Sequence, residues 1–248
     1  MDYLNNLYDD FNSRLNDINS LDDINDELIK IFKSNLNHIK NEVVQTGKFG
    51  GLLKKIEIQL NMIDQVSRLP GINKKLNSMR EQSIVLSVGA FEVFISDIFR
   101  TIANKSPEYY IWSNEKEKIY IDTGSFNSGF TLGDAIISHL KNKQYSFQDL
   151  QSILKAVENY FGLEISLDNE IKDKIIIGTS MRHIIVHNRS IIDVTFLKQT
   201  KNVDTIILEY KEGEKLHTTD AQVRDIGNAI REFSNYLTQA IAQRDEII

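Results

Sequence analysis

Cysteine is absent from this chain of 248 residues. Its absence excludes disulfide bridges, cysteine nucleophiles and thiolate metal sites. Proline is scarce, with only Pro70 and Pro107 along the whole length. Because proline interrupts the backbone hydrogen bonds of a helix, this scarcity favours long, uninterrupted helices.

We also expect neither a targeting segment nor a membrane segment. The first residues, MDYLNNLYDD, have neither the basic start nor the apolar core of a signal peptide. No continuous run approaches the roughly 18 apolar residues that suggest a membrane-spanning helix. We therefore expect a cytoplasmic protein without a membrane partner.

Basic residues are fewer than acidic residues, and the formal net charge is −6. Proteins that coat nucleic acid non-specifically usually carry a basic face, so this charge argues against a broad nucleic-acid footprint but not against a small site. Residues 171–201 are the exception, with six basic and two acidic side chains: Lys172, Lys174, Arg182, Arg189, Lys198 and Lys201 against Asp173 and Asp193. On charge alone, this stretch fits a solvated helix face as well as an anion-binding surface.

Apolar residues recur every three or four positions through most of the chain, which predicts helices. The pattern places them at 2–18, 22–46, 52–68, 72–104, 132–142, 147–161, from Asp168 to about His187, and from Asp220 onward. Thr131, Ser146 and Asp168 are the predicted caps of three of them. Residues 105–130 are expected to form an irregular loop.

The helix at 72–104 is apolar nearly all round in its second half, so it should lie in the centre of a bundle. Glu92 lies within that apolar stretch. Since burying an unpaired carboxylate is costly, Glu92 should find a partner or face a cleft.

Two short segments near the C-terminus predict strands. Residues 205–210 and 216–219 flank a turn at Gly213, a pattern typical of a β-hairpin. The fold class is therefore mainly α, with a small β-hairpin before the last helix. We expect residues 1–70 to form an N-terminal helical extension and residues 72–248 to form the main domain.

The segment most suggestive of chemistry is MRHIIVHNR, residues 181–189. Arg182 offers a planar fork of donors that matches phosphate. His187 gains or loses a proton near neutral pH. An imidazole that handles a proton and a guanidinium that stabilises a phosphorane suffice for metal-free attack of a ribose 2′-OH on the adjacent phosphate.

Helix geometry restricts how these groups can meet. Positions five apart, such as Arg182 and His187, point about 140° apart, whereas His183 and His187 share a face. Asn188 is expected to end the helix in a left-handed conformation. Two copies of the helix around a two-fold axis would line one cleft with both sets of residues. His183 and His187 also fit a metal pair, but no third ligand or acidic base accompanies them, so we expect neither a metal nor a cofactor.

The segment from Arg182 to His187 resembles the R-x4-6-H signature of the HEPN superfamily (higher eukaryotes and prokaryotes nucleotide-binding), and residues 72–248 are loosely similar to it. The wider context, RHIIVHNRSIID, is similar to HEPN proteins of toxin–antitoxin and phage-defence systems. The resemblance implies a HEPN-like helical bundle that dimerises through the motif helix. It also implies a metal-independent RNA endonuclease with Arg182 and His187 as catalytic residues and His183, Asn188 and Glu92 as accessory residues.

Two further basic residues are candidate RNA contacts, Arg189 and Lys174, although Arg189 could instead pair with an acid such as Asp193. The expected partners are RNA, a second copy of the chain, and an antitoxin or defence-system protein. The net negative charge and the segment 1–70 fit an alternative equally well: a catalytically silent HEPN protein that binds a nucleotide or a partner protein. In a third interpretation, a structural scaffold, Arg182 and His187 would bear no relation to any cleft.

Overall fold

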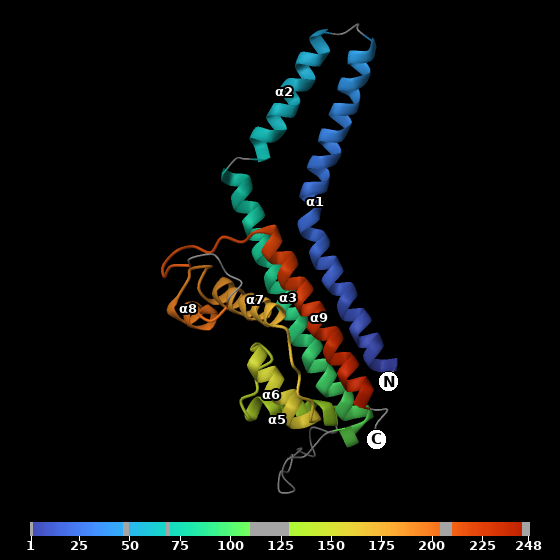
Figure 1. Ribbon diagram of the computed structural model, residues 1–248, viewed down its shortest axis with the longest axis vertical. Coiled ribbons are helices and arrows are strands. Elements are labelled where there is room, and N and C mark those ends of the chain that lie inside the picture. Colours follow the sequence, from blue (N-terminus) through green and yellow to red (C-terminus); the bar gives the residue numbers. More distant parts are fainter. Residues whose placement is uncertain (1, 47–49, 68–69, 110–128, 204–209, 245–248) are drawn as a thin grey trace.

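The computed structural model describes residues 2–46, 50–67, 70–109, 129–203 and 210–244. It confirms the prediction of a mainly α-helical protein (Figure 1). The helices are α1 (Asp2–Thr46), α2 (Gly50–Ser67), α3 (Pro70–Lys105), the 3-10 turn η1 (Pro107–Tyr109), α5 (Leu132–Asn142), α6 (Leu150–Phe161), α7 (Asn169–His187), α8 (Val194–Thr200) and α9 (Asp220–Arg244). Most of the loop predicted at 105–130 lies outside the described residues.

The N-terminal helix is longer than the sequence pattern predicted. The expected helices at 2–18 and 22–46 form the single helix α1. The prediction of two helices was wrong because neither proline nor glycine occurs between them, so nothing interrupts the backbone hydrogen bonds. Ser20 stays within the helix and donates its hydroxyl hydrogen bond to the Asp17 carbonyl at 2.7 Å.

Local capping sets several other helix boundaries. Thr131 and Asp134 form the capping box of α5, and Asp168 caps α7 as predicted. The predicted cap Ser146 was wrong, because α6 begins after Asp149, whose carboxylate accepts the Ser152 backbone N–H. Ser146 lies in the preceding turn, where its hydroxyl oxygen accepts the backbone N–H of Gln148.

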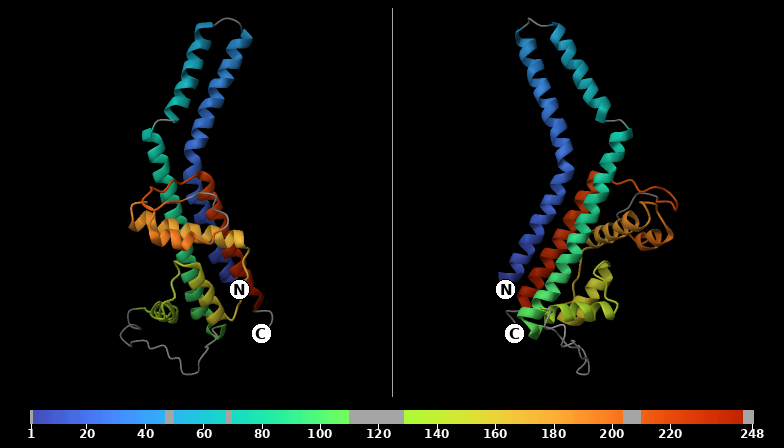
Figure 2. Two further views of the ribbon diagram at one scale, coloured as in Figure 1. Left: turned by 60° about the vertical axis from the view of Figure 1, so that its left-hand side comes forward. Right: turned by 180° about the vertical axis from the view of Figure 1, so that it is seen from behind.

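The apolar helix α3 lies at the centre of the body, in contact with α1, α5, α7 and α9 (Figures 1 and 2). Phe99 is fully buried and its ring stacks against Phe161, with 4.6 Å between centroids, and against Phe147, with 5.5 Å. Of the described helices, one span within α3, Lys74–Lys105, is long and apolar enough to cross a membrane, and half of its most apolar window is buried in the body. Neighbouring helices account for the buried half of this window, whereas Leu86 and Val93 of α3 remain exposed.

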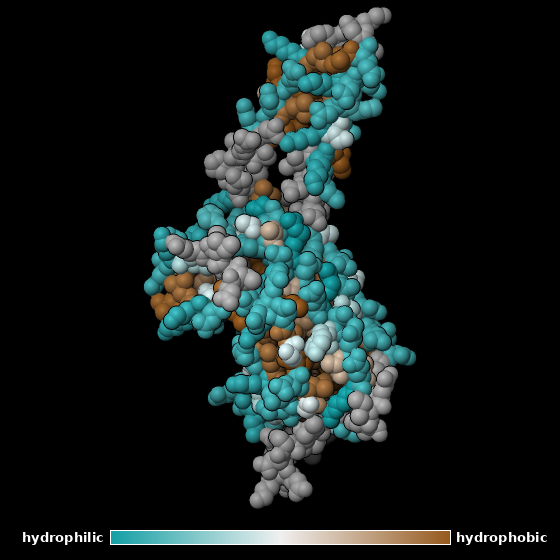
Figure 3. Space-filling model, in the orientation of Figure 1, coloured by the Kyte–Doolittle hydropathy of each residue, from teal (hydrophilic) through white to brown (hydrophobic). Residues whose placement is uncertain are grey.

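The second half of α1 and all of α2 extend beyond the body as a helical hairpin, residues 22–46 and 50–67, which we call the arm (Figures 1 and 2). Val43 and Ile56 are buried between its helices. The first part of α1 instead packs in the body, where Leu4, Phe11 and Leu15 join the same core as α3. Large apolar side chains are exposed on the arm (Figure 3): Ile31, Phe32, Ile39, Val44, Leu52, Ile58 and Met62.

The segment before α9 is anchored to the turn that follows α7. Lys215 forms an isolated antiparallel bridge with Ile191, and the Leu216 backbone N–H donates to the Ser190 carbonyl at 2.7 Å. The first strand of the predicted β-hairpin falls mainly on residues 204–209, which lie outside the described residues. Residues 216–219 form no strand, because the Leu216 N–H donates to the turn after α7 and the Thr218 N–H donates to the Asn77 side chain.

A glycine sets the distance between α7 and α9. A Cβ atom on Gly178 would lie 2.6 Å from Cγ2 of Ile226. Only a residue without a side chain therefore allows this approach, which fixes α7 and its exposed residues against the body.

Candidate functional site

Helix α7 positions the predicted catalytic residues at its C-terminal end. Its buried face, which includes Met181 and Ile184, packs into the core. Arg182 lies beside that face and its side chain is 19% exposed, whereas His183 and His187 are exposed to solvent. The helix thus holds a half-buried guanidinium and two accessible imidazoles near one another.

Arg182 faces Glu92 of α3 across the gap between the two helices. The Arg182 Nε and Glu92 Oε1 atoms are 3.7 Å apart, and the Glu92 side chain is 18% exposed. Within the described part of the chain, neither atom has a hydrogen-bond partner, although both are buried. The pair is therefore held by charge attraction without the added strength of a hydrogen bond. This contact agrees with the expectation that Glu92 finds a partner.

Gln148 completes the surroundings of Glu92. Its side-chain amide donates to Glu92 Oε2 at 3.3 Å. Burial raises the pKa of Glu92, and the charge of Arg182 and the hydrogen bond from Gln148 partly oppose that rise. A carboxyl group with a raised pKa is neutralised more easily, and its protonation would release Arg182.

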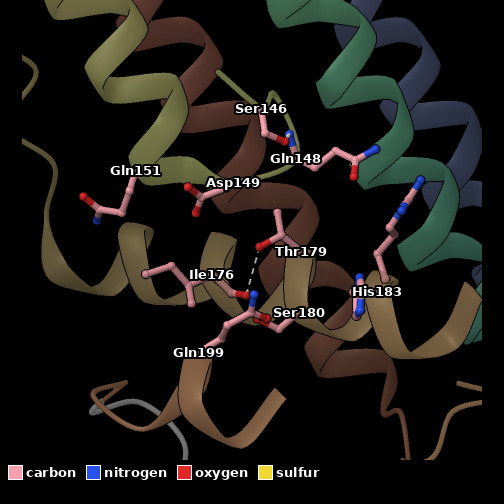
Figure 4. A pocket seen from close by; sticks show the side chains of 10 residues that line it. Ser146, Gln148, Asp149, Gln151, Ile176, Thr179, Ser180, His183 and Gln199 are labelled. Atoms are coloured by element: carbon pink, nitrogen blue, oxygen red, sulfur yellow. Dashed lines mark hydrogen bonds between the residues drawn. The ribbon is translucent and has the colours of Figure 1, made fainter. Parts of the chain in front are cut away.

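Two clefts meet at this pair. The first has a volume of about 400 Å³ and includes Arg182 and His183 in its lining, whereas the second, of about 580 Å³, includes Glu92. Ser146 and Gln148 line both clefts, so the connection between α5 and α6 forms their common wall. Figure 4 shows that residues of α6, α7 and α8 surround the first cleft.

The two histidines of the motif lie together. The ring centroids of His183 and His187 are 5.0 Å apart, which confirms that they share a helix face. His183 also lines the first cleft, but His187 does not. In the described residues of a single chain, no hydrogen bond or ring contact joins His187 to Arg182. His183 therefore lies between the two predicted catalytic residues.

The remaining predicted residues lie outside both clefts. The Asn188 side chain donates to the Ile191 carbonyl at 2.7 Å and so stabilises the turn after α7. The prediction of a left-handed Asn188 was wrong, since its φ is −126°. Arg189 and Ser190 adopt that conformation, with φ of 55° and 62°. They do so because the chain turns back here, and the Ser190 backbone N–H donates to the Ile184 carbonyl at 3.0 Å.

The candidate RNA contacts have different surroundings. Arg189 is exposed beyond the end of α7. The Lys174 ammonium donates to Glu170 Oε1 at 2.6 Å, and this hydrogen bond is the main cause of its raised pKa. Lys174 thus lies near the start of α7 with an acidic partner.

Sequence reasoning missed three glutamines that line the first cleft: Gln148, Gln151 and Gln199. They come from α6, the turn before it, and α8. Their spacing in the sequence carries no signal, since glutamine is common on exposed helix faces. In the described residues, no group of three or more His, Asp or Glu side chains is arranged to hold a metal ion. Comparison with family models, curated proteins and solved structures finds no match to this chain.

Proposed function

We propose that this protein is a metal-independent RNA endonuclease in which Arg182 binds the scissile phosphate and His187 transfers the proton. The observation that carries the proposal is the position of Arg182 where the two clefts meet, with the exposed His183 next to it on α7 and the exposed His187 more than one turn further on. A scaffold without a site would not require Arg182 to line a cleft.

The reaction needs only groups that the chain and its substrate supply. A ribose 2′-OH attacks the adjacent phosphorus atom, and its proton passes to a neutral imidazole. The bond between phosphorus and the 5′-oxygen then breaks, and the leaving oxygen takes up the proton from the imidazolium formed in the first step. The products are a 2′,3′-cyclic phosphate and a 5′-hydroxyl. Arg182 stabilises the negative charge that gathers on the phosphorane oxygens.

Glu92 acts in this proposal as the resting partner of Arg182. The incoming phosphate must replace the carboxylate, and it can do so because the 3.7 Å contact includes no hydrogen bond. Through the hydrogen bond from its side-chain amide, Gln148 can keep the Glu92 carboxylate away from Arg182 once the phosphate is bound. Glu92 is therefore a positioning residue, and His183 is an accessory residue beside the reacting groups.

A second copy of the chain is part of the proposal, because no hydrogen bond or ring contact joins Arg182 to His187 within one chain. Val186, about one turn after Arg182, is 47% exposed, and Val93 on α3, which lines the second cleft, is also 47% exposed. Exposed apolar side chains beside a site favour its burial in an interface. His187 of a second copy would then approach Arg182 across the two-fold axis.

The direct test is cleavage of single-stranded RNA in EDTA by the purified full-length chain. We expect Arg182→Ala and His187→Ala each to lose about 100-fold or more in rate, since charge stabilisation and proton transfer each contribute at least this much. Arg14→Ala and His38→Ala, exposed residues of the same types on α1, are the matched controls. Wild-type rates in both motif variants would refute the proposal.

The biological setting that the family resemblance suggests is a toxin or a phage-defence effector, with an antitoxin or another defence-system protein as partner. Its test is growth of a host that expresses either the wild type or His187→Ala. Growth arrest by the wild type alone is the expected result. Equal growth of both strains would contradict the toxin role.

A second candidate function, a catalytically silent binding protein, is favoured by the arm. Large apolar side chains such as Phe32, 59% exposed, and Met62, 57% exposed, lie on it without cover from the body. Exchanging both for Gln tests the two functions together. A binding protein should lose its partner, whereas cleavage by a nuclease site on α7 should persist.

A further inference from the structure

The first cleft, next to Arg182, has few charges for a site that would hold only phosphate. Its lining includes one permanent cation, Arg182, and one carboxylate, Asp149. Sites for several phosphates gather multiple cations or backbone donors. Most of the remaining lining is uncharged and polar: Ser146, Gln148, Gln151, Thr179, Ser180 and Gln199, with Ile176 as the apolar member. The lining therefore fits a polar, largely neutral group attached to a single anion.

Two of these glutamines are available to a ligand. Gln151 on α6 and Gln199 on α8 are exposed, and neither amide makes a hydrogen bond to the described part of the chain. The other polar groups are partly engaged. Gln148 donates to Glu92, and the Thr179 hydroxyl donates to the Ile176 carbonyl at 3.0 Å.

The free amides reach the cleft from different helices. Figure 4 shows Gln151 and Gln199 on separate sides of the cleft, with Ile176 of α7 between them. Ile176 provides an apolar surface on which a flat ring can rest, and His183 offers an aromatic face at another part of the lining. The cleft volume of about 400 Å³ also lies in the range of small-ligand pockets.

A glutamine amide presents one donor and one acceptor side by side. This pattern matches adenine on two edges, the N6 amino group with N7 and the N6 amino group with N1, so two amides on separate sides can each pair with one edge. Guanine instead has two acceptors, O6 and N7, on the first of these edges, and the pyrimidines lack that edge. Among the described residues that line the cleft, Arg182 is the only permanent cation, and the phosphate would pair with it. Proteins read RNA in this way where bases are unpaired and their edges are free.

We propose that this cleft binds the adenine base of an unpaired nucleotide, with Gln151 and Gln199 as the residues that determine base specificity and Arg182 on its phosphate. The inference that this nucleotide adjoins the cleaved bond rests on the proposed nuclease function. Binding of the adenine nucleotide does not depend on cleavage.

The first experiment measures binding alone. The full-length chain is titrated calorimetrically with AMP, GMP, CMP and UMP. We expect AMP to bind about tenfold or more tightly than GMP, because a well-formed amide–adenine pair discriminates by at least this factor. Gln151→Ala and Gln199→Ala should each weaken AMP binding by about tenfold. Gln59→Ala, an exposed glutamine on α2, should leave it unchanged.

Equal affinity for the four nucleotides, or AMP binding that survives both cleft substitutions, would overturn the adenine site. Thermal unfolding of each variant shows whether a loss of binding reflects a loss of folding. Gln151→Asn keeps the amide and should retain part of the preference for AMP.

The second experiment measures cleavage of single-stranded oligoribonucleotides that carry either A or G beside the cut position. Preferential cleavage next to A that Gln199→Ala abolishes supports the proposal. RNA that is cut without base preference refutes the adenine site and leaves the nuclease. AMP binding that depends on both glutamines, with no cleavage of any RNA, supports the adenine site and refutes the nuclease.

Discussion

The contact between Glu92 and Arg182 leads to a prediction that tests the central geometry of the site. The two atoms that approach are 3.7 Å apart, and their side chains are only 18% and 19% exposed. With an effective dielectric constant near 20, opposite charges at this distance attract by about 4.5 kcal/mol. Removal of both groups from water and the missing hydrogen bond offset most of this attraction.

We therefore expect a double-mutant cycle of Glu92→Gln and Arg182→Gln to give a coupling energy of about 1–2 kcal/mol, above that of exposed pairs. The two single variants should differ. Arg182→Gln leaves a buried carboxylate without its cation and should cost about 2–3 kcal/mol. Glu92→Gln should cost about 1 kcal/mol or less, since the long arginine can turn its head group toward water.

Urea denaturation of the four proteins at neutral pH and low salt measures the cycle. The exposed pair on the arm, Lys40 and Glu57, with 3.0 Å between Nζ and Oε1, is the matched control. Its side chains are 35% and 56% exposed, so its coupling should not exceed about 1 kcal/mol. If the effects at Glu92 and Arg182 add within about 0.3 kcal/mol, the two charges do not interact and the reasoning is refuted.

Three further predictions concern stability. Because burial raises the pKa of Glu92, the folded state binds its proton more tightly than the unfolded state does. The contribution of Glu92 to the free energy of unfolding should therefore fall as the pH rises from 4.5, the ordinary pKa, through the raised pKa of the folded state. Urea denaturation at several pH values should show this fall in the wild type but not in Glu92→Gln. Identical pH dependence in the two proteins would contradict the prediction. Phe99→Ala should cost about 3–5 kcal/mol in chemical denaturation, because its ring is fully buried, and a cost below about 1 kcal/mol would contradict that packing. Gly178→Ala should lower the melting temperature through a cost of about 1–3 kcal/mol, and adding Ile226→Leu, which removes the Cγ2 branch, should recover part of it, whereas an unchanged melting temperature would contradict the close approach.

The sequence by itself determined the mainly helical class and most helix boundaries. The helix predicted at 132–142 matches α5, and the predicted starts at Asp168 and Asp220 match the cap of α7 and the first residue of α9. These features depend on residues within one or two turns of each other, because capping and the 3.6-residue apolar period are local. The central place of α3 was also predicted, because a helix that is apolar nearly all round is expected to pack against several neighbours.

The tertiary structure alone decided which side chains surround the motif. Glu92 could be recognised from the sequence as a carboxylate in need of a partner, but only the packing of α3 against α7 brings it to Arg182. Gln151 and Gln199 carried no signal, since a glutamine gains a role only from what the fold places opposite it. Such contacts join residues far apart in the chain, and local propensity contains no information about them.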